Sequence, residues 1–154
     1  MPRYWLMKSE PDVYSIEDLR KDKRTYWDGV RNYQARNSLR DGLKKGDLVL
    51  YYHSNAEPSG VAGVARVVRE GYPDPSALDK KDDHYDPKHT AERPIWYVVD
   101  VEHVETFKKL VPLEALKAEP RLKTMLVIKR GMRLSVQPVE GAHFDIVRRM
   151  GQGT

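Results

Sequence analysis

Cysteine is absent from the sequence, although the chain is 154 residues long. Without thiols the chain can form no disulfide bond, offer no thiolate to a metal and use no cysteine nucleophile. A fold that does without disulfides suits a reducing compartment, so we expect a cytoplasmic protein.

Long hydrophobic runs and nucleotide-binding loops are absent too. No apolar run approaches the roughly 20 residues that a membrane helix needs, and the N-terminus has no apolar core of a signal peptide. We find no glycine-rich phosphate loop and no G-x-S-x-G nucleophile motif. The sequence therefore predicts no membrane partner, no cofactor and no recognisable catalytic set.

The composition is that of a globular protein with a basic charge balance. Hydrophobic residues make up 40% of the chain and charged residues 32%. The length fits one domain over residues 1–154. The net charge of +4 and the pI of about 9.2 are compatible with nucleic-acid binding, although many basic proteins bind none.

Short strands and short helices alternate along the chain. β-branched, apolar and alternating runs predict strands, and a capping serine or a leading proline predicts the start of a helix. We expect strands at 3–7, 48–53, 61–68, 94–104 (extended over 108–111) and 134–139, and helices beginning at Ser15 and spanning 32–43, 112–117 and 140–150. We expect a solvated turn at 21–25, a turn at Asp28-Gly29, and an irregular loop at 70–93 with one helical turn. This order predicts an α+β fold on a curled sheet or small barrel.

The most informative stretch reads Trp-Asp-Gly-Val-Arg-Asn-Tyr-Gln-Ala-Arg-Asn. Trp27 and Tyr33 offer flat rings, Asn32 offers a paired donor and acceptor, and the forked cations of Arg31 and Arg36 suit phosphates. Stacking surface, amide and guanidinium together are what recognition of a single nucleobase needs. The alternative is a helix start with an aromatic anchor and a solvated polar face.

A second candidate group ends the first strand. A serine or a backbone amide there could read a base edge, and a carboxylate could accept from an exocyclic amino group. The residues are Lys8, Ser9 and Glu10. The alternative is a turn with ordinary solvent contacts.

Three later segments supply further candidates for the same pocket. Tyr51 and His53 share one face of a strand that ends at Ser54, although a lone histidine is more often a hydrogen-bonded structural residue. Trp96 is a second candidate wall, or else a core residue. Ser135 lies on a strand face that could meet the pocket, or could be wet.

The loop over residues 82–89 contains two histidines and three aspartates. Such side chains can bind a metal, but their spacing matches no zinc or EF-hand signature and a proline interrupts them. We therefore expect no metal.

Several motifs, in order along the chain, resemble an EVE domain. They are Tyr-Trp-Leu-Met-Lys-Ser-Glu-Pro-Asp at 4–12, the stretch at 27–37, Tyr-Tyr-His-Ser-Asn at 51–55, Gly-Val-Ala-Gly-Val-Ala at 60–65, Trp-Tyr-Val-Val-Asp-Val at 96–101 and Leu-Ser-Val-Gln-Pro at 134–138. The resemblance implies a PUA-like pseudo-barrel, a curled mixed β-sheet flanked by short helices that is shared with YTH and ASCH domains.

The same resemblance implies a non-catalytic module that binds nucleic acid, RNA or DNA. It would take a modified base, such as 5-hydroxymethylcytosine or methylated adenine, into an aromatic-lined pocket with a basic rim. Lys8-Ser9 and Trp27 occupy places that match YTH domains, in which that tryptophan lines the methyl-adenine cage. Trp27 would stack on the base, and Ser9, Asn32 and Ser54 would read its edge.

Two other classes of function compete with this interpretation. Some ASCH-like relatives process RNA or nucleosides, and a hydrolase of that kind would need a general base in the same cleft, with Glu10, Asp28 and His53 as candidates. A titratable group buried beside the pocket with a perturbed pKa would favour the hydrolase, and an exposed carboxylate would favour the binding module. A protein-interaction domain would instead present an apolar surface patch.

Overall fold

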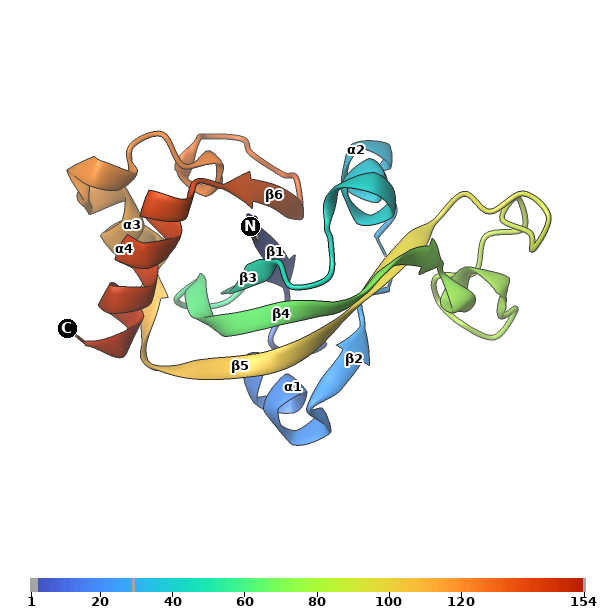
Figure 1. Ribbon diagram of the computed structural model, residues 1–154, viewed down its shortest axis with the longest axis horizontal. Coiled ribbons are helices and arrows are strands. Elements are labelled where there is room, and N and C mark those ends of the chain that lie inside the picture. Colours follow the sequence, from blue (N-terminus) through green and yellow to red (C-terminus); the bar gives the residue numbers. More distant parts are fainter. Residues whose placement is uncertain (1–2, 29, 154) are drawn as a thin grey trace.

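The computed structural model describes residues 3–28 and 30–153, whose strands form one curled sheet (Figure 1). The six strands lie in the order β2-β5-β4-β3-β1-β6. They are β1 (Tyr4–Ser9), β2 (Arg24–Tyr26), β3 (Leu48–His53), β4 (Gly60–Pro73), β5 (Tyr97–Pro112) and β6 (Val136–Val139). β1 and β3 run parallel and the other neighbouring strands run antiparallel, so the sheet is mixed.

β4 and β5 are the longest strands and give the sheet its curl (Figure 1). Their register shifts at several points, and each such bulge bends a strand and increases its twist. A Cβ at Gly63 would lie 2.3 Å from the carbonyl oxygen of Glu105, so only glycine fits where the two backbones meet.

Helices cover both faces of the sheet. α1 begins with a capping box, in which the Ser15 hydroxyl accepts from the Asp18 N–H and the Asp18 carboxylate accepts from the Ser15 N–H. The helices are α1 (Ile16–Asp22), α2 (Tyr33–Asn37) with the π-helical turn η1 (Ser38–Gly42), α3 (Leu113–Ala118) and α4 (Gly141–Gln152), with 3-10 turns η2 (Pro75–Leu78), η3 (Pro120–Leu122) and η4 (Leu126–Ile128). α3 and α4 lie at the end of the molecule opposite the β4–β5 connection (Figure 1).

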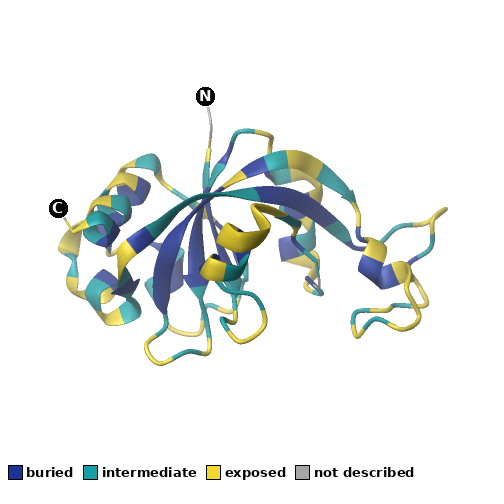
Figure 2. Cartoon of the chain, turned by 90° about the horizontal axis from the view of Figure 1, so that it is seen from below, coloured by how far each residue is buried: buried dark blue, intermediate teal, exposed yellow. Residues whose placement is uncertain are grey.

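The strands separate two hydrophobic clusters, one on each face of the sheet. Buried residues run along the central strands (Figure 2). Alternation along β1 sends Trp5 and Met7 to the cluster beneath α1 and α2, and Leu6 to the cluster beneath α3 and α4. Trp5 is 6% exposed, and its indole N–H donates to Asp47 at 2.9 Å, which confirms it as a core residue. Both clusters take residues from β1, β3 and β4.

The structure corrects the expected secondary structure in the charged segments. Residues 24–26 form β2 rather than a solvated turn, because they pair with Asp100 to Glu102 of β5. Residues 70–73 belong to β4 rather than to a loop, and the second long strand runs unbroken from Tyr97 to Pro112. Ladder hydrogen bonds hold these polar segments in strands without an apolar pattern. The expected turn at Asp28 lies partly outside the described residues, at Gly29.

Candidate functional site

A cavity of about 510 Å³ opens beside the carboxyl end of β1. Its volume lies within the range of about 300–1,000 Å³ that is usual for small-molecule sites. Six residues predicted for the pocket or for phosphate binding line it: Lys8, Ser9, Glu10, Trp27, Arg31 and Ser135. Seven further residues complete the lining: Val13, Tyr14, Thr25, Tyr26, Asp28, Val30 and His84.

Two backbone hydrogen bonds and one long connection bring these distant segments together. The Lys8 N–H donates to the Ser135 carbonyl at 2.9 Å, which joins the end of β1 to the approach to β6. The Trp27 N–H donates to the Val99 carbonyl at 2.8 Å, so the chain follows β5 for one residue beyond β2. Residues 74–96 connect β4 to β5 and place His84 at the cavity.

Trp27 forms a wall of the cavity and belongs to the core at the same time. Its ring lies edge-to-face with Tyr51, with 5.3 Å between centroids and 81° between planes. Only 8% of the residue is exposed. The ring is therefore more enclosed than the sequence suggested, and its packing contributes to stability as well as to the cavity.

Tyr26 is an open aromatic wall that the sequence did not predict. It is 42% exposed and lines the cavity beside Trp27. Burial of its hydroxyl, followed by the nearby carboxylate of Asp28, raises the pKa of Tyr26, so the phenol keeps its proton and can donate. Tyr14 has its pKa raised to about 12 by burial and by the hydrogen bond to Asp22.

The polar edge of the cavity carries carboxylates and a hydroxyl. The Ser9 hydroxyl donates to the Tyr14 carbonyl at 2.9 Å, which fixes its orientation. Glu10 accepts from the Asn55 amide. Asp28 is half-buried, and burial together with the charge of Asp74 raises the pKa of its carboxyl. The cavity thus offers fixed acceptors to the N–H groups of a ligand.

Asp28, Asp82 and His84 offer ligand atoms that all lie within 4.8 Å of one another. The His84 Nδ1 lies 3.2 Å from a carboxylate oxygen of Asp82 and 3.7 Å from one of Asp28. All three side chains are partly exposed, and exposed acidic groups gather in this way without an ion. The absence of a metal site therefore stays a prediction.

The cations at the cavity are already bonded within the protein. Arg31 donates to the buried carboxylate of Asp74 at 3.1 Å and to the carbonyls of Val30 and His84. The Lys8 ammonium donates to the Met132 carbonyl at 3.2 Å, and burial lowers its pKa. The guanidinium of Arg31 acts first as a structural group, which the sequence could not reveal.

Three predicted residues, Tyr33, Arg36 and Trp96, form a cluster outside the described lining of the cavity, and a fourth, Asn32, caps the helix beside them. Tyr33 stacks on Trp96 with 5.1 Å between centroids, and Arg36 lies over Tyr33. The Arg36 guanidinium donates to the Ile95 carbonyl at 2.7 Å, and the Trp96 indole N–H donates to Asp86 at 2.7 Å. Asn32 caps α2, because its side chain accepts from the Ala35 N–H.

The residues predicted on β3 support the cavity from behind rather than lining it, within the described ranges. The Tyr51 hydroxyl donates to the Tyr14 carbonyl at 2.6 Å. His53 Nε2 accepts from the Ile16 N–H at 3.1 Å, and burial lowers the pKa of this histidine. The Ser54 N–H donates to the Ser9 carbonyl at 3.0 Å. His53 is thus the hydrogen-bonded structural histidine that the sequence analysis weighed as an alternative.

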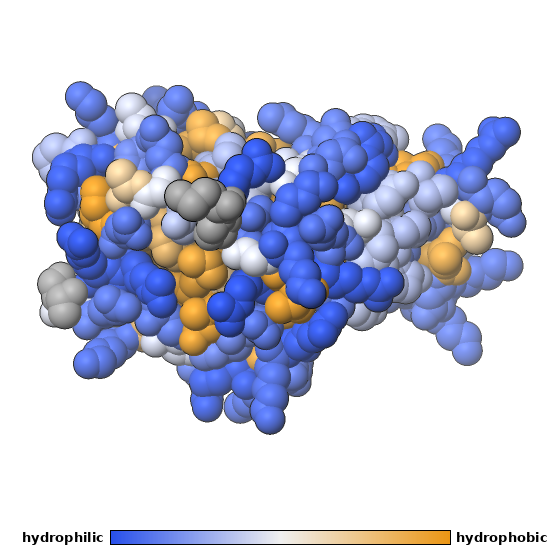
Figure 3. Space-filling view, in the orientation of Figure 1, coloured by the Kyte–Doolittle hydropathy of each residue, from blue (hydrophilic) through white to orange (hydrophobic). Residues whose placement is uncertain are grey.

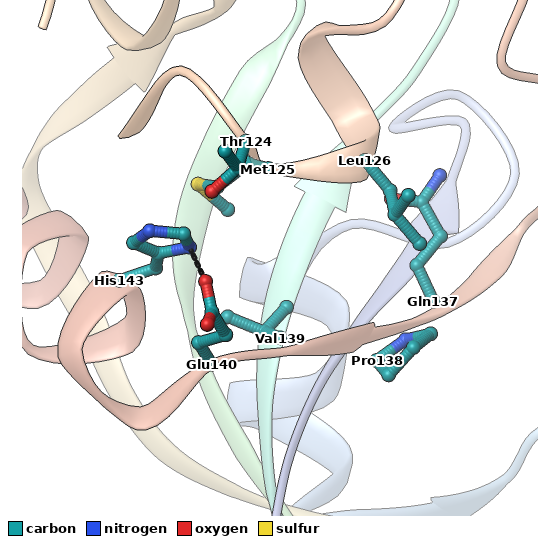
Figure 4. A pocket seen from close by; sticks show the side chains of 8 residues that line it. All are labelled: Thr124, Met125, Leu126, Gln137, Pro138, Val139, Glu140 and His143. Atoms are coloured by element: carbon teal, nitrogen blue, oxygen red, sulfur yellow. Dashed lines mark ion pairs between the residues drawn. The ribbon is translucent and has the colours of Figure 1, made fainter. Parts of the chain in front are cut away.

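A second cavity of about 450 Å³ lies between β6, α4 and the turn before η4 (Figure 4). Its polar feature is an ion pair in which His143 Nδ1 lies 3.2 Å from Glu140. Gln137 lines it too, with its amide N–H donating to the Leu134 carbonyl. Among the described residues no Trp, Tyr or Phe lines this cavity, so it lacks the flat wall on which a base would stack.

The surface shown in Figure 3 is mostly hydrophilic, with hydrophobic groups separated by polar ones. Within residues 3–28 and 30–153, no helix has the length and apolar character needed to cross a membrane. Among the large hydrophobic residues that are described, Val13 has the highest exposed fraction, 72%, and it lines the first cavity.

The chain resembles known proteins over nearly its whole length. The sequence model of the EVE domain matches residues 3–150. Thymocyte nuclear protein 1 of Homo sapiens is 42% identical over 163 residues, covering 94% of this chain and 72% of the human protein. A hypothetical protein from Leishmania major is 46% identical, with a TM-score of 0.94 over 99% of this chain and 96% of that chain.

Two solved structures contain nucleic acid. Human THYN1 protein in complex with DNA containing 5-methylcytosine is 41% identical, with a TM-score of 0.89 over 97% of this chain and 98% of that chain. The YTH domain of the Zygosaccharomyces rouxii MRB1 protein, in complex with N6-methyladenosine RNA, is 16% identical, with a TM-score of 0.51 over 98% of this chain and 87% of that chain. The second likeness is one of fold, and it confirms the PUA-like architecture. From the family match and the identity to its relatives, the chain belongs to the EVE domain family.

Proposed function

We propose that this protein binds nucleic acid without catalysing a reaction on it, and takes one modified base into the cavity beside β1. Trp27 and Tyr26 supply the walls on which the base stacks. Ser9, Glu10 and Asp28 read its edge. The location of the protein, expected in the cytoplasm, stays a prediction.

The observation that carries the proposal is the composition of the cavity. A base turned out of a helix loses its stacking, and an aromatic side chain replaces about 1–3 kcal/mol of it per base. The cavity has such a wall in Tyr26, 42% exposed, next to the enclosed ring of Trp27. Fixed polar groups lie at one side of the cavity. The flat face of a nucleobase would therefore stack on the aromatic wall, and its polar edge would meet these groups.

Cytosine is a base whose edge suits these polar groups. Its exocyclic amino group donates, and Asp and Glu accept from that group when proteins read cytosine. Asp28 and Glu10 supply the carboxylates. The complex of human THYN1 protein with DNA containing 5-methylcytosine, at 41% identity over 97% of this chain, supports the same choice of ligand.

The test compares two oligonucleotides and two variants. Fluorescence anisotropy measures the binding of labelled DNA that contains either 5-methylcytosine or cytosine. Tyr26→Ala should weaken binding of the methylated DNA, whereas Tyr33→Ala should leave it unchanged. Tyr33 is a matched control because it is also exposed, at 61%, but stacks on Trp96 outside the cavity. Equal affinity of the wild-type chain for both oligonucleotides would remove modified-base recognition from the account.

A hydrolase acting in the same cavity is the second candidate, and Asp28 favours it. The carboxyl is half-buried with a raised pKa, as a general base requires. His53, another candidate base, has its Nε2 bonded to the Ile16 N–H. Cleavage of an oligonucleotide by the wild-type chain, lost in Asp28→Asn, would decide for the enzyme; intact oligonucleotide after prolonged incubation decides for the binding module.

A further inference from the structure

A second groove begins where the first cavity ends. Its volume is about 540 Å³, and it runs along η4, the turn that follows it and α3. Lys8 lines both the cavity and this groove. The two hollows therefore meet at Lys8.

The groove is strongly basic. Five of the 27 lysine and arginine residues of the chain line it, and its described lining contains no aspartate or glutamate. These five are Lys8, Lys117, Lys129, Arg130 and Arg133. The cavity itself is mixed in charge, because Glu10 and Asp28 offset Lys8 and Arg31. The groove, rather than the cavity, is where the electrostatic attraction for an anion is concentrated.

The cations of the groove are free of ion pairs in the described residues, although Lys8 donates to the Met132 carbonyl. Across residues 3–28 and 30–153, none of the five forms an ion pair with a carboxylate. Lys117, Lys129, Arg130 and Arg133 are exposed. Arg31, by contrast, is bonded to Asp74 and to two carbonyls. A phosphate at Arg31 would have to compete with these bonds, whereas a phosphate at the four exposed cations of the groove would displace no ion pair.

A tight turn presents the basic side chains. The Met132 N–H donates to the Lys129 carbonyl at 3.1 Å and closes the turn. Gly131 has φ of +78°, a conformation that favours glycine. The turn is anchored to the cavity side as well, since the Lys8 ammonium donates to the Met132 carbonyl. The position of the basic turn relative to the cavity is thus fixed by hydrogen bonds.

We propose that this groove binds the sugar–phosphate backbone of the same strand whose base enters the cavity. The inference rests on the proposed function. Phosphates spaced along a strand suit a row of exposed cations that form no ion pairs, and Lys8 lies where the base would join the backbone. Backbone contacts carry no sequence information, so the groove contributes affinity while the cavity contributes the choice of base.

The test is the salt dependence of binding. The variant Lys129→Gln/Arg130→Gln removes two charges from exposed side chains and leaves the cavity lining intact. Each phosphate contact that is lost should lower the slope of log Kd against log salt by about 1, so this variant should lose about 2. The effect should be equal for DNA containing 5-methylcytosine and for unmodified DNA, and the preference between them should not change.

A charge-matched control is available on β5. Lys108→Gln/Lys109→Gln also removes two exposed charges, and neither residue lines the groove. Its salt slope should equal that of the wild-type chain. Equal slopes for the wild-type and the groove variant would overturn the groove proposal and leave base recognition standing. A wild-type chain that binds no oligonucleotide would overturn both proposals. If the wild-type chain binds polyglutamate, and the groove variant loses that binding but binds DNA as before, the groove binds an acidic protein and not the DNA backbone.

Discussion

Replacement of Trp27 by alanine should lower stability and base binding together, whereas replacement of Tyr26 by alanine should lower base binding alone. The two side chains line one cavity, but Trp27 is 8% exposed and Tyr26 is 42% exposed. Trp27 belongs to the core cluster and packs against the buried ring of Tyr51. The difference in burial is what separates the two variants.

The magnitudes follow from that burial. Removal of a core tryptophan costs about 3–5 kcal/mol, which for a chain of this length corresponds to a fall in Tm of about 6–20 °C. Tyr26 lies on an edge strand and loses little packing, but an aromatic that stacks on a base contributes about 1–3 kcal/mol to binding. Tyr26→Ala should therefore weaken binding of DNA containing 5-methylcytosine by roughly 5- to 150-fold, with a nearly unchanged Tm.

The assay pairs a thermal melt with an anisotropy titration on each variant. Trp27→Phe serves as the control for packing, because it keeps a ring at the wall and should recover part of the lost Tm. A Trp27→Ala variant that melts with the wild-type chain would refute the assignment of this ring to the core. A Tyr26→Ala variant that binds as well as the wild-type chain would refute the stacking wall.

Three further predictions concern the polar groups. Arg31→Ala should destabilise the protein by about 1–3 kcal/mol in a denaturant titration, because the buried Asp74 carboxylate loses a charged donor. Asp28→Asn should raise the Tm at pH 7, because burial raises the pKa of this carboxyl and destabilises its charged form. In anisotropy titrations the same variant should lose part of its preference for methylated cytosine. Burial lowers the pKa of His53, so at acidic pH the unfolded chain binds a proton more readily than the folded chain does. Stability should therefore fall as the pH drops below about 6.5. Thermal melts from about pH 7.5 to 5 should show a shallower decline in Tm for His53→Gln than for the wild-type chain.

The sequence was most informative where a single local signal determined both the structure and the position. Lys8, Ser9 and Glu10 follow a short apolar strand and precede Pro11, so they lie at the end of a strand that must stop. Trp27 follows soon after and also reaches the cavity. The capping pattern of Ser15 and Asp18 likewise predicted the start of α1 correctly.

Long-range pairing accounts for what the sequence did not show. Tyr26 lies in β2, whose residues carry no apolar alternation and are held by hydrogen bonds to β5. Tyr33 and Trp96 are 63 positions apart, and nothing local predicts that they stack on each other. The groove was missed because its cations come from β1, α3 and the turn after η4, which meet only in the folded chain.

The most direct measurement of base recognition is a ¹H–¹⁵N NMR titration that follows the three tryptophan indole N–H resonances, assigned by Trp→Phe variants. Trp5 donates to Asp47 and Trp96 donates to Asp86, and neither lines the cavity, whereas Trp27 does. Addition of an oligonucleotide containing 5-methylcytosine should shift the Trp27 resonance and leave the other two in place. A shift of Trp96 with Trp27 unmoved, or binding that moves none of the three, would contradict a base in this cavity.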